Sequence, residues 1–140
     1  MVGANLFTKV APFVNQICDL LNLSNDGKIA IVDYGDYGFE IWNTVTGKLQ
    51  HIYNDIIGAS GSNNLSGDYQ KVVVWGYGVG KSSLSVWDLD TGKQLHEFST
   101  QLVNGDGWRC GALNSDGSVL AASNNEGYIY FYDVKSGEKI

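Results

Sequence analysis

The chain has 140 residues, of which 44% are hydrophobic and 17% are charged, a composition typical of a folded domain. Its net charge of −6 argues against nucleic acid or an anionic membrane surface as a partner. No run of about 20 apolar residues is present, so no membrane-spanning segment is predicted. Two widely spaced cysteines do not make a disulfide framework, which favours a reducing compartment, and we expect the protein to be cytoplasmic.

The first predicted unit covers about residues 15–54. Asp26-Gly27 is a hairpin dipeptide, because a tight turn needs positive φ, and it leads into the short apolar run 29–32. An alternating stretch ending at Trp42 follows, and then a turn and a more polar strand at about 49–53. Short apolar runs between turns are typical of buried strands, so we predict a four-stranded antiparallel meander.

The same succession of elements recurs over about 58–99 and 108–140. The strand-ending aromatic residues Trp42, Trp87 and Tyr132 are 45 residues apart (87 − 42 and 132 − 87). The glycines of the turns that follow them, at 47, 92 and 137, keep the same spacing. Three copies at one period indicate a repeat architecture.

The order of these landmarks resembles the WD40 family over about residues 17–140. The landmarks are a Ser-Asp-Gly turn, a strand of small residues, a Trp-Asp strand as at 84–88, and a Thr-Gly-Lys turn. The resemblance implies an all-β fold of four-stranded β-propeller blades around a central channel. Asn43 replaces the family's Asp in the first copy, and Tyr132 replaces its Trp in the third. The family's Gly-His pair is missing in all copies, which leaves its buried His–Ser–Trp–Asp network without a histidine.

Residues 4–9 lie about one period before the outer strand of the first unit, so we interpret them as an outer strand that closes a blade of a neighbouring chain. Three blades are too few to close a ring, because propellers usually have four to eight. We therefore predict that the ring is completed by copies of the chain, as a six-bladed homodimer with a nine-bladed homotrimer as the rival. A fragment of a longer propeller is the alternative.

Several chemical motifs of the sequence do not predict a phosphate site, a metal site or a catalytic site. The stretch 75–82 ends in Gly-Lys-Ser like a phosphate-binding loop, but such a loop opens a helix, whereas residues 83–87 alternate as a strand. His51 and His96 occupy equivalent places on outer strands without a partner cluster, so we expect solvated side chains and no metal. Cys18 and Cys110 open the first strands of their units, where a buried small residue is expected. No nucleophile–base–acid set can be assembled, so we predict no enzyme activity and no cofactor.

The remaining candidate is a surface. In the WD40 fold, the loops between second and third strands share one rim with the loops that enter each unit. Here that rim carries Tyr34, Asp36, Tyr37, Trp75, Tyr77, Lys81, Asn124, Asn125 and Glu126, with Trp108 and Arg109 at the entry to the third unit. Aromatic residues and arginine are over-represented in binding hot spots, so the predicted partner-binding residues are Tyr34, Tyr37, Trp75, Tyr77, Trp108 and Arg109. For Trp75 and Trp108, packing between blades is the alternative.

Two functions follow from this surface. The first is a non-catalytic interaction scaffold that binds a protein or peptide on the loop rim. The second is a small-molecule or glycan binder that uses the aromatic rim or the central channel, where Tyr34, Trp75, Tyr77 and Trp108 would stack on a ligand. Both rest on analogy at the level of the fold.

Overall fold

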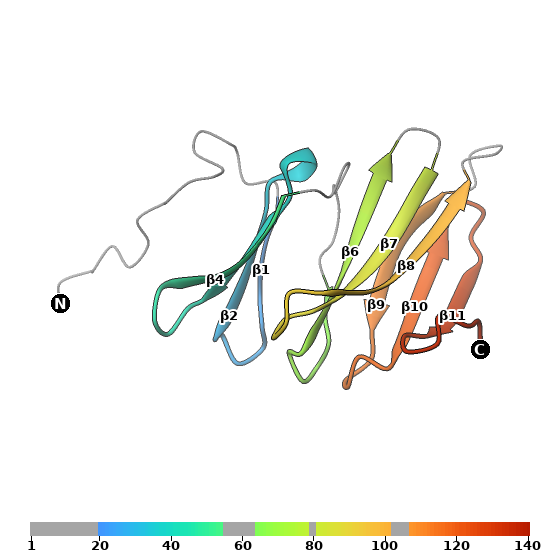
Figure 1. Ribbon diagram of the computed structural model, residues 1–140. Coiled ribbons are helices and arrows are strands. Elements are labelled where there is room, and N and C mark those ends of the chain that lie inside the picture. Colours follow the sequence, from blue (N-terminus) through green and yellow to red (C-terminus); the bar gives the residue numbers. More distant parts are fainter. Residues whose placement is uncertain (1–19, 55–63, 79–80, 102–106) are drawn as a thin grey trace.

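The computed structural model describes residues 20–54, 64–78, 81–101 and 107–140, and it confirms the all-β prediction. Three antiparallel sheets stand side by side in chain order, and the row they form is open (Figure 1). The strand predicted at 4–9 and Cys18 lie outside the described residues.

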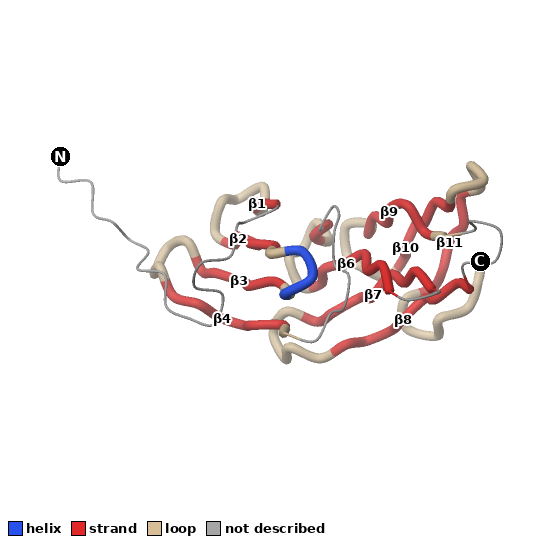
Figure 2. The backbone as a smooth tube through the Cα atoms, turned by 90° about the horizontal axis from the view of Figure 1, so that it is seen from above, coloured by secondary structure: helices blue, strands red, loops and turns tan. Residues whose placement is uncertain are grey.

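Each sheet is a meander in which consecutive strands pair. The first consists of β1 (Leu20–Leu23), β2 (Ile29–Asp33), β3 (Phe39–Asn43) and β4 (Lys48–Tyr53), with the short 3-10 turn η1 (Gly35–Tyr37) between β2 and β3. The second consists of β5 (Asn64–Leu65), β6 (Lys71–Gly78), β7 (Lys81–Asp88) and β8 (Gln94–Gln101). The third consists of β9 (Trp108–Leu113), β10 (Val119–Asn124) and β11 (Ile129–Asp133), followed by a single bridge between Tyr132 and Lys139. Figure 2 shows the three sheets from above.

Equivalent residues of the three units take equivalent places in their sheets. One set, which we call the back slot, pairs as Ala30–Trp42, Val72–Trp87 and Leu120–Tyr132. The neighbouring set, which we call the front slot, pairs as Ile31–Ile41, Val73–Val86 and Ala121–Phe131. Because successive side chains of a strand point to opposite faces, the two slots face opposite neighbours.

The core consists of two clusters, one between each pair of adjacent sheets. The front of the first sheet, with Ile31 and Ile41, packs on the back of the second, with Val72 and Val74. The front of the second sheet, with Val73, Leu84, Val86 and Phe98, packs in the same way on Leu120 and Ala122 of the third. Each sheet is therefore stabilised by its neighbours rather than by a core of its own.

The turns after the third strands have the same geometry in all three units. The side-chain oxygens of Asn43, Asp88 and Asp133 accept hydrogen bonds of 2.9, 2.8 and 2.7 Å from the N–H groups three residues further on. The glycine that follows has a φ of 67°, 67° and 74° in the three units, a region in which other residues are strained. This shared geometry explains why the spacing of 45 residues is strict at these turns.

The glycine-rich stretch of the second unit is the hairpin that the sequence predicts. β6 and β7 remain paired to its end, where Gly76 pairs with Ser83 and Gly78 with Lys81. Lys81 begins a strand rather than a helix, so the loop has no helix N-terminus to hold a phosphate.

Candidate functional site: two interaction surfaces

The front face of the third sheet is exposed, although the same face is covered in the other two units. In the front slot, Ile41 and Val86 are 0% exposed, whereas Phe131 is 50% exposed. The register places Phe131 beside Ala121 and Ala112, and Ile129 beside Ser123 and Cys110. We call these six residues the open face.

The open face is mostly apolar. Ile129 is 66% exposed, and Ile140, whose N–H donates a hydrogen bond to the Phe131 carbonyl, is also exposed. Fully burying an Ile or Phe side chain stabilises a protein by roughly 1.5–3 kcal/mol. Clustered apolar residues at a surface are typical of interaction sites, so this face is one candidate surface.

Cys110 lies on the open face, and the expectation that it is buried is wrong. Its thiol is exposed, and its Sγ lies 3.0 Å from the Ser123 Oγ. The reason is its position rather than its residue type, because the front face of the third sheet has no neighbouring sheet among the described residues.

The second candidate surface is the loop rim, where the predicted partner-binding residues divide into exposed and buried ones. Tyr37 is 54% exposed and Arg109 is exposed. Trp75 is half-buried, and its indole Nε1 donates a hydrogen bond of 2.7 Å to the Trp108 carbonyl. Tyr77 belongs to β6, but its side chain, like those of Asp36 and Lys81, is outside the described part.

Trp108 is a correction to the predicted rim. It is 3% exposed, and its ring meets those of Tyr130 and Tyr132 edge-on, with centroids 5.7 and 6.1 Å apart. Its backbone N–H donates to the Ser82 Oγ of the preceding sheet. The alternative foreseen for this residue, packing between blades, is therefore the observed one.

Tyr34 is a second correction, because it is only 6% exposed. Its hydroxyl donates a hydrogen bond of 3.0 Å to the Glu40 Oε2, which also accepts one of 2.9 Å from the Trp42 Nε1. Glu40 is 1% exposed, and within the described ranges its Oε1 has no hydrogen-bond partner. Tyr34 thus provides a hydrogen bond to the buried carboxylate of Glu40. Because Tyr34 and Trp108 are both buried, neither ring is available to contact a ligand.

Of the other rim residues in the third unit, Asn125 and Glu126 are exposed. Asn124 is buried, and its Oδ1 accepts the Tyr128 N–H at 2.9 Å, so it holds the loop together. Tyr128 is 58% exposed and was not predicted. Its position two residues before the alternating strand 130–132 is the signal that could have identified it.

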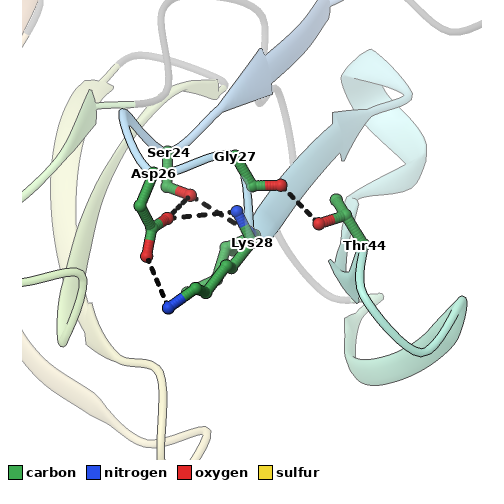
Figure 3. Close-up of polar contacts among 6 residues, drawn as sticks. Ser24, Asp26, Gly27, Lys28 and Thr44 are labelled. Atoms are coloured by element: carbon green, nitrogen blue, oxygen red, sulfur yellow. Dashed lines mark hydrogen bonds and ion pairs between the residues drawn. The ribbon is translucent and has the colours of Figure 1, made fainter.

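The opposite rim carries the turns between the first and second strands, and a carboxylate organises each of them. In the first unit, Asp26 accepts hydrogen bonds from the Ser24 hydroxyl at 2.6 Å and the Lys28 N–H at 3.1 Å (Figure 3). The Thr44 hydroxyl ties this turn to the third strand through the Gly27 carbonyl. The hydrogen bond from Ser24, and then that from Lys28, lower the pKa of Asp26.

The same turn recurs in the other two units. Burial acts to raise the pKa of Asp68, but hydrogen bonds from Ser66 and Gln70 outweigh it and the pKa is lowered. Hydrogen bonds from the side chain and N–H of Ser118 lower the pKa of Asp116. All three turn carboxylates are therefore ionised at neutral pH.

The histidines lie between blades rather than in solvent. Both are half-buried, and a Cβ built on Gly92 would lie 3.2 Å from the His51 ring, with Gly137 still closer to His96. The outer strands of the first two units thus contact the turn of the next unit. In the described part of the chain, no three His, Cys, Asp or Glu side chains gather as metal ligands. Among the same residues, no helix has the length and apolar character needed to cross a membrane.

The central tryptophan of the second unit, Trp87, is half-buried and packs against the first core cluster. The Trp87 Nε1 is buried and has no hydrogen-bond partner among the described residues, while Asp88 accepts hydrogen bonds from Thr91 instead. A network of the family's kind is therefore not present at Trp87. The strand layout persists without it, because apolar packing between sheets carries the fold.

Comparisons with known proteins support the fold and no closer relationship. No family model and no curated protein matches the chain. The crystal structure of RRP9 WD40 repeats superposes with a TM-score of 0.69 at 11% sequence identity, over 90% of this chain and 38% of that one. The structure of U3-55K gives a TM-score of 0.68 at 13% identity, with the same coverage. The chain thus has a WD40-like β-propeller fold and spans 38% of the length of these structures.

Proposed function

We propose that this WD40-like chain is a non-catalytic protein-interaction scaffold that assembles with copies of itself through the open face and binds a protein or peptide on its loop rim. The observation that carries the proposal is the exposure of Phe131, in a slot that is fully buried in both preceding units. The likeness to WD40 repeat structures suggests an interaction scaffold, and the sequence offers no catalytic set.

The two contacts between adjacent sheets of the chain indicate what kind of surface would cover the open face. The front slots of the first two sheets are covered by the back slots of the next, which pair Val72 with Trp87 and Leu120 with Tyr132. A second copy would bring the corresponding pair, Ala30–Trp42 of its first sheet. This contact is head-to-tail and generates a ring if the rotation closes, which favours the six-bladed dimer over the nine-bladed trimer.

The back slot of the first sheet has a consequence for the rate of assembly. Ala30 and Trp42 are each only 8% exposed in the single chain, so docking a copy there requires a local rearrangement. Association that needs a conformational change is slower than rigid docking. We therefore expect assembly to depend on protein concentration and incubation time. In the assembled ring, residues 4–9 would pair with the last blade of the neighbouring chain. We expect this assembly to take place in the cytoplasm.

The test is the mass of the particle by size-exclusion chromatography with light scattering. The chain weighs 15.2 kDa, so a dimer is expected at 30.4 kDa (2 × 15.2) and a trimer at 45.6 kDa (3 × 15.2). Phe131→Asp places a charge in the open face and should return the particle to the mass of one chain. Tyr37→Ser is the matched control, because it removes an aromatic residue of similar exposure from the rim and should leave the mass unchanged. A wild-type particle of 15.2 kDa at high concentration would refute the assembly.

The rim is tested separately by affinity capture with quantitative mass spectrometry. Tyr37→Ser and Arg109→Ala should each lose a protein that wild-type retains, because exposed aromatic and arginine side chains dominate interface energies. Phe131→Asp should retain that protein if rim and open face act independently. Retention of every captured protein by both rim variants would exclude the rim as the binding surface.

A further inference from the structure

A cavity of about 190 Å³ lies between the first and second units, on the rim opposite Tyr37. Its wall is largely polar. The residues that matter for its chemistry are Asn22, Ser24 and Asn25 of the first unit and Ser66, Gly67 and Tyr69 of the second. This cavity is independent of both surfaces described above, and none of its residues belongs to the predicted rim.

The cavity exists because two turns fail to meet. Between the second and third units, the Asp68 N–H donates a hydrogen bond of 2.7 Å to the Ser115 carbonyl, and the turns are in contact. The equivalent groups between the first and second units are the Asp26 N–H and the Gly67 carbonyl. Neither group has a hydrogen-bond partner among the described residues. Gly67 and Asn25, the residue before Asp26, line the cavity, so this donor and this acceptor lie at its edge.

Tyr69 is a second and independent anomaly at the same place. Its φ is 60°, and it is the one residue other than glycine with positive φ in the described part of the chain. The equivalent residues of the other two turns, Gly27 and Gly117, have φ of 70° and 65°. Glycine would adopt this conformation without strain, so a tyrosine is held there against its backbone preference. Strained residues of this kind cluster at functional sites.

The size and charge of the cavity narrow the class of ligand. A volume of about 190 Å³ is below the roughly 300 Å³ at which pockets begin to hold drug-sized molecules, so it fits a single ring. The carboxylates of Asp26 and Asp68 stand in the two turns that bound it, and they repel an anion. The unpaired donor and acceptor suit a ligand whose groups both donate and accept hydrogen bonds, as hydroxyls do.

We propose that this cavity binds one uncharged hydroxylated ring, a sugar unit, with the ring against Tyr69 and its hydroxyls bridging the Asp26 N–H and the Gly67 carbonyl. The Asn25 side chain, for which no hydrogen bond to a described residue is found, supplies a further donor and acceptor. The ligand takes the place of the turn-to-turn hydrogen bond that the next pair of units makes directly.

The experiment is a titration of ¹⁵N-labelled protein followed by backbone amide NMR. The probes are the methyl glycosides of glucose, galactose, mannose and N-acetylglucosamine at millimolar concentrations. Two comparison probes are glucose 6-phosphate, an anionic sugar, and N-acetylglycine N-methylamide, an uncharged peptide unit. At least one glycoside should shift the Asp26 and Asp68 amides saturably, and the two comparison probes should bind more weakly.

Tyr69→Gly is the decisive variant, because it relieves the backbone strain and removes the ring. It should raise the urea midpoint of unfolding and weaken the glycoside about tenfold. Asn25→Ala leaves Tyr69 in place and should also weaken binding, whereas Tyr37→Ser should not. The proposal is overturned if no glycoside shifts the two amides, if Tyr69→Gly binds as wild-type does, or if either comparison probe binds more tightly.

Discussion

Replacing Tyr53 by phenylalanine should stabilise the protein, although it removes a polar group from a well-packed position. The ring of Tyr53 stacks on Phe39, with centroids 4.2 Å apart, and meets Trp87 edge-on at 4.9 Å. Its hydroxyl is buried and has no hydrogen-bond partner in the described part of the chain. Tyr53→Phe keeps both ring contacts and deletes only the unsatisfied oxygen.

The magnitude follows from two effects. A buried polar group without a partner costs about 1–3 kcal/mol of stability. Removing the oxygen also leaves a small void, so the free energy of unfolding should rise by about 1 kcal/mol at neutral pH. Burial, together with the nearby Asp88 carboxylate, raises the pKa of Tyr53 to about 12. Because the folded-state pKa exceeds the ordinary value of 10.0, the unfolded chain ionises first, and the free energy of unfolding falls as the pH rises from 10 towards 12. By pH 11 the loss in wild-type is about 1.4 kcal/mol, and Tyr53→Phe should not show it.

The assay is urea unfolding at fixed protein concentration, followed by tryptophan fluorescence between pH 7 and pH 11. Tyr37→Phe is the control, because its hydroxyl is on an exposed side chain and the free energy of unfolding should change by less than about 0.5 kcal/mol. If Tyr53→Phe is less stable than wild-type at pH 7, or if both lose the same free energy by pH 11, the hydroxyl has a partner and the reasoning is wrong.

Two further predictions concern the turns. Acid should destabilise the fold, because the pKa values of Asp26 and Asp88 are lowered in the folded state. Such carboxylates stabilise the folded state above their ordinary pKa of 3.8, and this contribution is lost as the pH falls through 3.8 and below. The urea midpoint of unfolding should therefore drop between pH 5 and pH 3. Asp88→Asn keeps an acceptor for Thr91 and should make this drop smaller. A variant whose midpoint falls with pH as steeply as that of wild-type would contradict the prediction. Gly38→Ala should cost about 3 kcal/mol or more, because φ is 109° and the added Cβ would overlap the Tyr53 carbonyl, whereas Gly27→Ala, with positive φ but open space around it, should cost about 1 kcal/mol. Equal effects in thermal unfolding would show that the backbone contact at Gly38 does not matter.

The fold was predictable because local signals repeat. After each third strand, the side-chain oxygen of Asn43, Asp88 or Asp133 and the positive φ of the glycine that follows fix the turn within a few residues. Three weak signals at a constant spacing of 45 residues reinforce one another, so the sheets and their order could be inferred without coordinates.

The candidate site was less predictable because exposure depends on what lies across the neighbouring sheet. Tyr34 and Tyr37 stand three residues apart in the same connection, yet the first is buried against Glu40 and the second is half exposed. Phe131 occupies the same slot as Ile41 and Val86, and nothing in its own strand reveals that it alone is uncovered.

By itself, the sequence determined the strands and the turns between them, because these depend on residues close along the chain. Only the tertiary structure decided that Trp108 packs between blades, that Cys110 is exposed and that the first two turns leave a cavity beside Tyr69. Contacts between sheets join residues far apart in sequence, and a single missing hydrogen bond between two turns has no counterpart in any local pattern.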